Sequence, residues 1–343
     1  MIPRRSAIRC GFGTARTRSA RVLLRGNFWS SPFAVSAQTL VTDAVPHDPS
    51  LQRDAPWTFE SALKDGTVEE SVNLLVHRRL AFALIRPMQG RFESVSPNHL
   101  TLLSGAIGVC AGICSYRSVE AGPAWLALGG LLLMASAVVD CADGMLARLR
   151  GQSSELGRLL DGIVDQVTGI SAWYGISHAV CAGIEVPGEW LYCTFALFSV
   201  VVHVALYDQM KSSFVALTSP KVAAVPNKPA QSGFERAVGA LHSTVYGAIM
   251  RTVGGGDAAP PDCDPAAARR HLSTAMRKIT YLGLGTQFFV LYSAALLGAV
   301  THVWVTFALA QVTLSVLLNA WVVVALVSWK RGVASLRAEQ AGT

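Results

Sequence analysis

The stretch VVDCADGMLARLRGQSSELGRLLDGIVDQVTG, residues 138–169, decides the fold and the chemistry of this chain. Asp140 and Asp143 lie one helical turn apart and share a helix face, as do Asp161 and Asp165 on the next apolar stretch. The turn between the two pairs is short, so the helices that carry them must be antiparallel neighbours. We therefore expect four carboxylates to converge at one depth of a helical bundle.

Convergence of this kind requires cations, because like charges at low dielectric repel strongly. Carboxylate oxygens favour hard ions such as Mg²⁺ or Mn²⁺ over zinc. Four carboxylates are enough to bridge two ions, and two-metal sites suit attack at phosphorus because they stabilise the attacking and the leaving oxygen. The pattern predicts a site for two Mg²⁺ or Mn²⁺ ions.

The residues between the carboxylates favour an enzyme over an ion pathway. Gly144 and Gly157 remove side chains where a substrate must approach the backbone. Arg148 adds a fixed cation suited to phosphate. A divalent-cation transporter is the alternative from another class, since acids inside a membrane also mark ion pathways. Transport would not require glycine and arginine at these offsets.

The composition is that of a membrane protein. Of 343 residues, 51% are hydrophobic and 15% are charged, whereas soluble domains carry about 25% charged residues. A spanning helix needs about 20 largely apolar residues. The expected fold is all-α, a polytopic membrane protein with six transmembrane helices at residues 98–118, 124–147, 159–181, 188–208, 279–300 and 304–328.

The formal charge of +7 is spread unevenly along the chain. Lys and Arg concentrate in alternate loops, which predicts that both termini and the 148–158 turn face the cytoplasm. A basic stripe of this kind suits anionic membrane lipids, and we expect no nucleic acid partner. The seven cysteines lack metal-site or disulfide spacing and fit packing roles.

The chain divides by composition. Residues 1–42 are Arg-rich and acid-poor, which is typical of an organelle transit peptide or of an unstructured basic leader; a transit peptide would place the active site on the matrix side. The predicted units are a basic leader and linker at 1–58, an amphipathic juxtamembrane helix region at 59–92, a six-helix domain at 93–332 containing a long cytoplasmic loop at 212–278, and a tail at 333–343.

The spacing D-x2-D-G-x2-A-R-x8-G-x3-D-x3-D fixes eight positions over 26 residues: Asp140, Asp143, Gly144, Ala147, Arg148, Gly157, Asp161 and Asp165. It resembles the signature of the CDP-alcohol phosphotransferase family, also called CDP-alcohol phosphatidyltransferases. The six-helix layout over roughly residues 70–330 is similar as well.

The resemblance implies roles for the matching positions. Asp140, Asp143 and Asp161 would be metal ligands, and Asp165 would be a ligand and also the general base. The implied contacts with the CDP-alcohol are Asn98, Thr101, Gly144, Ala147, Arg148, Ser154 and Gly157. The SPNHLT stretch that holds the first two of these residues also fits ordinary helix capping.

The stretch HVALYDQMKSSF at residues 203–214 occupies the region that helps to form the acceptor pocket in the family. Bacterial phosphatidylinositol-phosphate synthases look similar there but carry Tyr-x-Lys-x-Arg. In this chain Tyr207 matches, Gln209 replaces the Lys, and Lys211 replaces the Arg. Tyr207 and Lys211 are therefore expected acceptor contacts, and the loss of one cation argues against a doubly charged acceptor.

The resemblance implies a phospholipid-synthesis enzyme. It would transfer a phosphatidyl group from a CDP-alcohol to a small alcohol acceptor such as inositol, inositol phosphate or glycerol phosphate, with release of CMP. Six helices favour CDP-diacylglycerol as the donor. The alternative within the family is a CDP-choline or CDP-ethanolamine enzyme acting on diacylglycerol. A homodimer is a further expectation.

Overall fold

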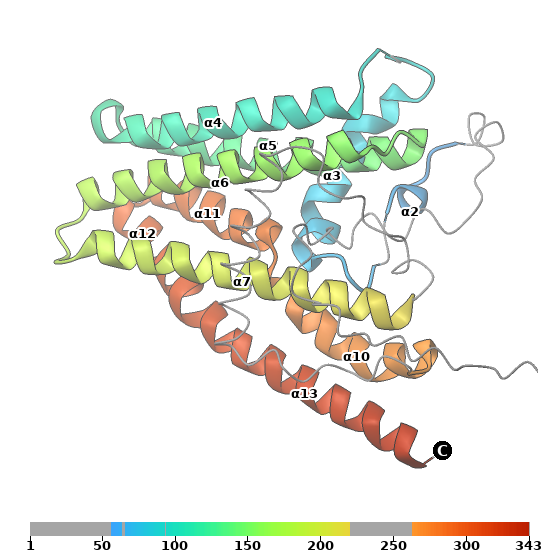
Figure 1. The fold of residues 1–343 in the computed structure, drawn as a ribbon. Helices are drawn as coiled ribbons and strands as arrows, with labels where there is room; N and C mark the ends of the chain where they lie inside the picture. The colour runs from blue at the N-terminus through green and yellow to red at the C-terminus, as the bar shows by residue number, and fades with distance from the viewer. Residues whose placement is uncertain (1–55, 64–65, 93, 220–262, 343) are drawn as a thin grey trace, which may run out of the picture.

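The computed structural model describes residues 56–63, 66–92, 94–219 and 263–342, and all its regular elements are helical (Figure 1). The predicted leader and most of the predicted 212–278 loop lie outside these ranges. The longer helices are α3 (Arg78–Ile85), α4 (Pro97–Ala121), α5 (Pro123–Arg150), α6 (Glu155–Gly183), α7 (Glu189–Thr218), α10 (Pro265–Ile279), α11 (Leu284–Val300), α12 (Val303–Val312) and α13 (Leu318–Gly342).

The first four predicted spans correspond to helices α4 to α7, and the last two correspond to α11 and to the α12–α13 rod. Within the described ranges, four helices are long and apolar enough to cross a membrane, or five if the bent pair Pro265–Leu282 and Leu284–Val300 counts as one span. Helix α6, which carries two of the predicted site aspartates, does not meet that criterion. The all-helical prediction is confirmed, whereas the number of spans is confirmed only as four or five.

The ends of the first helices follow the local sequence. Ser96 caps α4 by accepting a hydrogen bond from the His99 amide, and Pro97 occupies the first turn. Gly122 separates α4 from α5 with a φ of 93°, and Gly151 ends α5 in the left-handed conformation with a φ of 63°. Glycine adopts both without the strain that a side chain would cause. These two turns reverse the chain twice, so α5 runs antiparallel to α4 and to α6, and both α5 and α6 pack on α4.

Helices α4 and α6 approach each other through small residues. A methyl group on Gly108 would lie 2.4 Å from the Thr168 side chain, and one on Gly175 would lie 2.1 Å from the Gly112 carbonyl oxygen. The Ser136 hydroxyl of α5 donates to the Ser104 carbonyl of α4 at 2.8 Å. Close backbone approach of this kind is common between helices in membranes, and it fixes α4 against α6.

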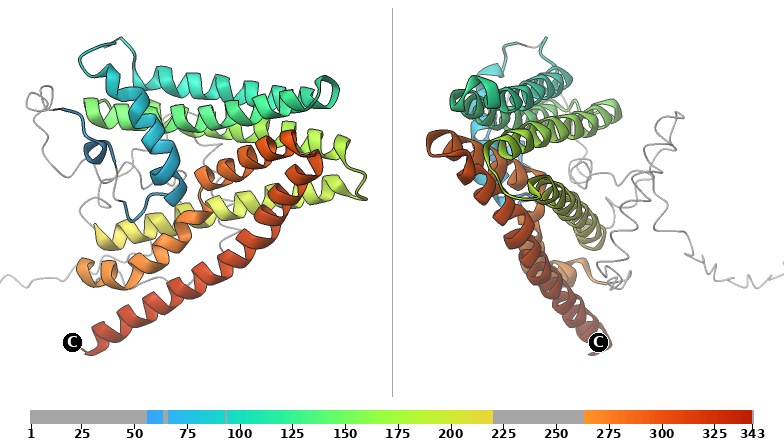
Figure 2. Two further views of the ribbon diagram at one scale, coloured as in Figure 1. Left: turned by 180° about the vertical axis from the view of Figure 1, so that it is seen from behind. Right: turned by 90° about the vertical axis from the view of Figure 1, so that its left-hand side faces the viewer.

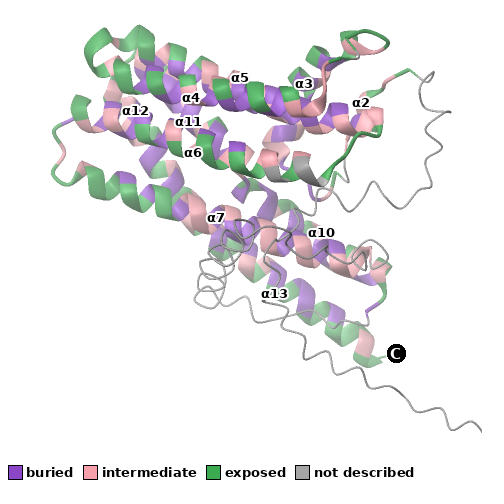
Figure 3. Cartoon of the chain, turned by 45° about the horizontal axis from the view of Figure 1, so that its top comes forward, coloured by how far each residue is buried: buried purple, intermediate pink, exposed green. Residues whose placement is uncertain are grey.

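A second group of helices lies beside this layer (Figure 2). Helix α10 falls inside the predicted 212–278 loop and packs against α7 and α13, burying Leu272, Met276 and Val333. The break between α10 and α11 bends the chain by 41°. Figure 3 shows buried positions alternating with exposed ones along α7 and α13, as expected for helices with one outward face.

The segment before α4 contains α2 (Phe59–Ala62), the π-helical turn η2 (Asn73–His77), α3 and the short turn η3 (Arg86–Met88). Its burial pattern differs from that of the predicted amphipathic helix. Polar side chains such as Asn73 and His77 are buried, whereas Leu75, Leu80 and Leu84 are exposed. A helical segment is present, but the predicted interfacial amphipathic helix is not confirmed, because the polar residues point into the protein.

Candidate active site

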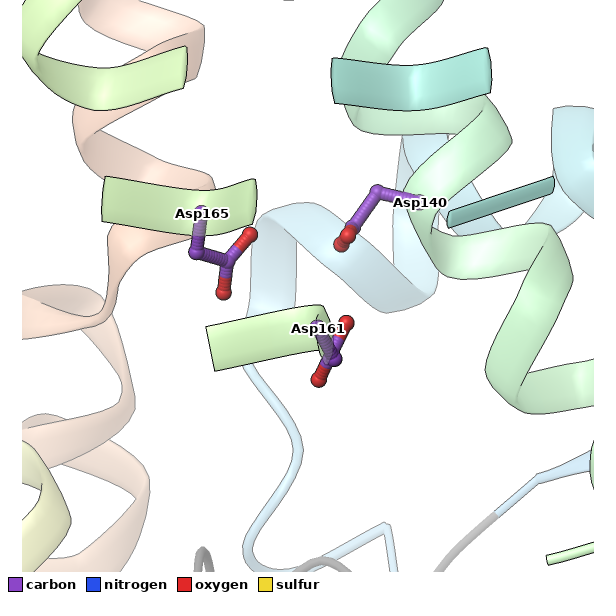
Figure 4. A group of neighbouring side chains, drawn as sticks. All are labelled: Asp140, Asp161 and Asp165. Carbon is purple, nitrogen blue, oxygen red and sulfur yellow. The ribbon is translucent and has the colours of Figure 1, made fainter. Parts of the chain in front are cut away.

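Three carboxylates meet between α5 and α6, two helices that both pack mainly on α4 (Figure 4). Asp140 comes from α5, and Asp161 and Asp165 come from adjacent turns of α6. One ligand oxygen from each residue lies within 4.8 Å of the corresponding oxygens of the other two. The i,i+4 spacing on α6 places two of the three carboxylates on one face, as predicted. The prediction that α5 and α6 are direct neighbours is not confirmed, because both pack mainly on α4.

Asp143 borders the group instead of completing it. Its carboxylate is buried, and one of its oxygens accepts a hydrogen bond from the Thr101 hydroxyl of α4. Its charge still acts on Asp140 and Asp165, so it lies within electrostatic range of the other acids. The structure therefore joins Thr101 to the acidic group through Asp143.

The predicted nucleotide contacts gather at the start of α6. Ser154 caps this helix, and its hydroxyl accepts a hydrogen bond from the Gly157 amide at 3.0 Å. The Asn98 side-chain oxygen lies 3.0 Å from the position that a methyl group on Gly157 would occupy. The absence of a side chain at Gly157 thus leaves room for Asn98. At Gly144 the nearest such neighbour is the Arg148 guanidinium, 3.4 Å away, and Ala147 lies one turn before the end of α5.

Arg148 is held by a segment that sequence reasoning did not connect to the site. Its Nε donates a hydrogen bond to the Ala62 carbonyl of α2 at 2.8 Å. Its Nη2 is buried and has no hydrogen-bond partner among the described residues. The guanidinium is therefore fixed at one edge and has an unused donor at another.

The predicted acceptor residues are both buried and are joined to each other. The Lys211 ammonium donates to the Tyr207 hydroxyl at 3.2 Å, and that hydroxyl donates to the Val68 carbonyl at 2.9 Å. The charges of Asp208 and Glu70 act on Lys211. The α7 cation thus lies among acidic neighbours within the chain.

Three charged residues of the 69–78 segment belong to this region and were missed as site residues. Glu69 and Arg78 form a buried ion pair with an N–O distance of 3.0 Å. Glu70 accepts a hydrogen bond from the Thr286 amide at 3.0 Å, at the start of α11. The signal in the sequence is a pair of acids shortly before two arginines, within the region predicted to be an amphipathic juxtamembrane helix.

Burial shifts the pKa of two groups in this segment, which lies outside the spanning helices. It raises the pKa of the Glu70 carboxyl to about 7, although the hydrogen bond from the Thr286 amide acts in the opposite direction. It also lowers the pKa of the His77 imidazole to about 4, together with the charge of Arg78. His77 is therefore neutral at pH 7, where its ring nitrogens lie 2.7 Å from the Asn73 side-chain oxygen and 3.2 Å from the Tyr292 hydroxyl.

A cavity of about 420 Å³ lies next to Glu69, between the 66–74 segment and the turn that follows α10. Hydroxyl groups, the Arg277 guanidinium and the Tyr281 ring line it. None of the predicted site residues lines this cavity. Through Glu69 and its partner Arg78 it adjoins the region of the acidic group.

The donor set fits divalent metal ions. The three carboxylates supply only oxygen ligands, which suit hard ions such as Mg²⁺ and Mn²⁺. The Asp140 Oδ1 atom is buried without a hydrogen-bond partner among the described residues. A buried acceptor of this kind is unfavourable unless a cation or a donor satisfies it. Asp140, Asp161 and Asp165 are therefore the residues that would hold a metal.

The fold and the site define a helical membrane-type bundle with an all-carboxylate site. Within that class, residues 94–230 match the family model described as CDP-alcohol phosphatidyltransferase. The matched residues include α4 to α7 and with them every predicted site residue.

Curated relatives match over shorter stretches. The chain is 28% identical over 125 residues to the bifunctional IPC transferase and DIPP synthase of Aquifex aeolicus, covering 36% of this chain and 26% of that protein. It is 31% identical over 83 residues to the archaetidylinositol phosphate synthase of Pyrococcus horikoshii, covering 24% and 41%. The chain thus spans less than half the length of these relatives.

Proposed function

We propose that this protein is a membrane phospholipid-synthesis enzyme that transfers a substituted phosphate group from a CDP-alcohol to an alcohol acceptor and releases CMP. The observation that carries the proposal is the group of Asp140, Asp161 and Asp165, set at the spacing of the family signature inside the matched domain. The proposed donor is CDP-diacylglycerol, and Asn98, Thr101, Gly144, Ala147, Arg148, Ser154 and Gly157 are its proposed contacts.

In the proposed reaction, an acceptor hydroxyl attacks the phosphorus that carries the lipid alcohol. A new phosphorus–oxygen bond forms, the bond to the CMP oxygen breaks, and CMP leaves with that electron pair. Asp165 takes the hydroxyl proton as general base. When bound, two Mg²⁺ or Mn²⁺ ions would stabilise the attacking and leaving oxygens as Lewis acids. Asp143 is proposed as a fourth metal ligand, with Thr101 orienting it through their hydrogen bond.

The acceptor is proposed to be an inositol, an inositol phosphate or glycerol phosphate, bound near Tyr207 and Lys211. The name of the Pyrococcus horikoshii relative favours the inositol class. The acidic neighbours of Lys211 favour an acceptor of low negative charge, because they already balance the ammonium.

A direct assay tests the reaction. The purified protein in lipid nanodiscs is given labelled CDP-diacylglycerol, Mg²⁺ and a panel of alcohols, and the lipid product and CMP are identified. We expect metal-dependent CMP release with one preferred acceptor. Release only with CDP-choline or CDP-ethanolamine and diacylglycerol would reassign the donor. Uptake of divalent ions into vesicles without CMP release would point to a transporter instead.

The proposed topology has six spans, with α6 as the most polar of them, and places both termini and the 148–158 turn on the cytoplasmic or matrix side. Lys and Arg concentrate on that side of the chain. A single cysteine at position 153, in a background without other reactive thiols, should resist an impermeant reagent added to intact cells or organelles. Labelling from outside would contradict this orientation. Crosslinking in the same membranes tests the proposed homodimer.

A further inference from the structure

Arg78 is a buried cation that no family motif assigns. It is the first residue of α3 and lies on the same face as Ala81 and Ile85, which are three and seven positions further along. That face packs on α5, where Ala142 and Met145 are fully buried. Arg78 itself is 4% exposed. The α3 helix therefore directs a guanidinium toward the α5 turn that carries Asp140.

The contacts of Arg78 use one edge of the guanidinium. Its Nε donates to the Glu69 carboxylate at 3.0 Å, and both side chains are at most 5% exposed. Its Nη1 is buried and has no hydrogen-bond partner among the described residues. A planar guanidinium can bind one partner at each edge, so Glu69 fixes its orientation while the Nη1 edge remains unused.

The unused donor is close to the acidic group. The charge of Arg78 acts on Asp140 and also on Arg148, so the two guanidiniums lie within electrostatic range of each other. The segment that carries Arg78 passes behind the three carboxylates in Figure 4, and α5 contacts both η2 and α3. Three buried polar atoms in this region have no hydrogen-bond partner among the described residues. They are Arg78 Nη1, Arg148 Nη2 and Asp140 Oδ1.

The two guanidiniums with unused donors lie near the carboxylate site, and together these groups indicate which kind of ligand would bind there. The charges of Glu69 and Asp143 act on Arg148, but each guanidinium keeps a buried donor without a hydrogen-bond partner among the described residues. A buried donor without a partner is unfavourable. A phosphate group presents several oxygens to guanidiniums and to metal ions at once. A phosphate-bearing substrate would accept hydrogen bonds from both Arg78 Nη1 and Arg148 Nη2, whereas Asp140 Oδ1 would be satisfied by a bound metal ion.

We propose that Arg78 is a phosphate-binding residue of this site: its Nη1 donates to a phosphate oxygen of the bound substrate while Glu69 holds the guanidinium in place. This inference rests on the proposed function. The phosphate has two sources, the diphosphate of the CDP-linked donor or the phosphate of a phosphorylated acceptor. A purely structural ion pair would behave differently, because replacing both partners of such a pair by apolar groups is often neutral.

The test compares three variants of the full-length protein in nanodiscs with Mg²⁺ present. The Arg78→Met/Glu69→Met double variant removes the ion pair without leaving one charge buried alone. Arg78→Lys keeps the charge and loses the planar donor edge. Arg79→Met is the matched control, because it removes the same charge from an adjacent exposed position. Calorimetry measures the binding of CDP and of cytidine, and kinetics give the KM for inositol and for inositol phosphate.

A contact with the donor would weaken CDP binding about 10-fold to 100-fold in the double variant and in Arg78→Lys, since a hydrogen bond to a charged group is worth about 1.5–3 kcal/mol. Cytidine affinity and the Arg79→Met control would not change. A contact with the acceptor would instead raise the KM for inositol phosphate by a similar factor and leave that for inositol unchanged. If neither quantity changes in folded Arg78→Lys and double variants, Arg78 is only structural. If the unmodified protein neither binds CDP nor releases CMP, the proposed function fails instead.

Discussion

The buried carboxylates come from two regions of the chain, the 69–78 segment and the helices α5 and α6. The two groups differ in the residues that surround them. In the 69–78 segment, Glu69 is paired with the Arg78 guanidinium. Glu70 accepts the Thr286 amide and interacts with the charge of Lys211. Each glutamate therefore has a donor or a cation supplied by the chain.

The aspartates at the start of α6 and the end of α5 lie close to one another. Asp165 and Asp161 are the charges that act most strongly on Asp140, ahead of the Arg78 cation. Like charges this close repel one another, and a divalent cation bound among them would relieve the repulsion. Burial of an acid therefore does not by itself indicate function; the clustering of several carboxylates is the more informative observation.

The largest expected effect follows from removing one charge of the aspartate group. Asp140→Asn should lower the rate of CMP release at least about 1000-fold, because metal ions contribute several kcal/mol to stabilising the transition state. The size-exclusion profile of the variant should match that of the unmodified protein. If Asp140→Asn kept most of its activity, the metal assignment would be wrong for this chain.

Asp165→Asn should separate the general base from the ligands. We expect it to retain donor binding and to slow the transfer step about 100-fold or more, within the range of about 100-fold to 10,000-fold typical of general-base assistance. Single-turnover CMP release and CDP-diacylglycerol affinity are measured on the same preparation. Lost binding with an unchanged rate for the donor that still binds would show that Asp165 is only a ligand.

Metal ions should stabilise only one of the two acidic groups. A ligand at about 100 times its Kd stabilises the folded state by about 2.7 kcal/mol, so Mg²⁺ should raise the Tm of the unmodified protein and a chelator should reverse this. Asp161→Asn should lose most of the Mg²⁺ response. Glu70→Gln is the matched control and should keep it, because Glu70 is partnered within the chain. If Mg²⁺ changed the Tm of both variants equally, the aspartate group would not be the metal site.

The smallest expected effects concern Glu70 itself. Glu70→Ala leaves the Thr286 amide without its acceptor and should lower the free energy of unfolding by about 1–3 kcal/mol. Glu70→Gln keeps an acceptor oxygen and should cost less. Chemical unfolding in mixed micelles measures both. Equal losses in the two variants would show that the negative charge matters and the hydrogen bond does not.

The pH dependence of Glu70 has a definite sign. Its pKa is raised in the folded protein from 4.5 to about 7, so folding favours the protonated form. This contribution to stability is complete below about pH 4.5 and is lost as the pH rises through about 7. The free energy of unfolding of the unmodified protein should therefore fall between pH 5 and pH 7.5 relative to that of Glu70→Gln. The steepest possible slope is about 1.36 kcal/mol per pH unit. Parallel pH profiles of Tm for the two proteins would contradict the shift.

The sequence was sufficient for the helices and for the aspartates because both depend on local spacing. Apolar runs located α4 to α7, and the i,i+3 and i,i+4 spacings located Asp140, Asp161 and Asp165 on facing helices. The metal and substrate roles of these residues stay predictions. Asp143 was expected to converge with the others, but its hydrogen bond with Thr101 of α4 depends on a third helix that local spacing does not describe.

The burial of the 69–78 segment could not be predicted in the same way. Its alternation of charged and apolar residues is typical of a surface helix, and only tertiary packing reveals that Glu69 and Arg78 are inside. The same holds for the contact between Arg148 and the Ala62 carbonyl, which are 86 positions apart. Helix α10 was missed because its polar composition and the neighbouring glycine- and proline-rich stretch are typical of a linker.

The direct contact of α4 with α6 has a consequence for how such a protein can change over evolution. A side chain at Gly175 would collide with the Gly112 carbonyl, so these two helices behave as one rigid piece that carries both Asn98 and Asp161. Substitutions along that seam disturb the two sides of the donor region together. The walls formed by α7 and by the 68–78 segment meet through side chains, which can be exchanged one at a time. If Asn98 and Asp161 serve the donor and α7 serves the acceptor, as proposed, a lineage can change its acceptor alcohol through α7 while the donor side stays the same.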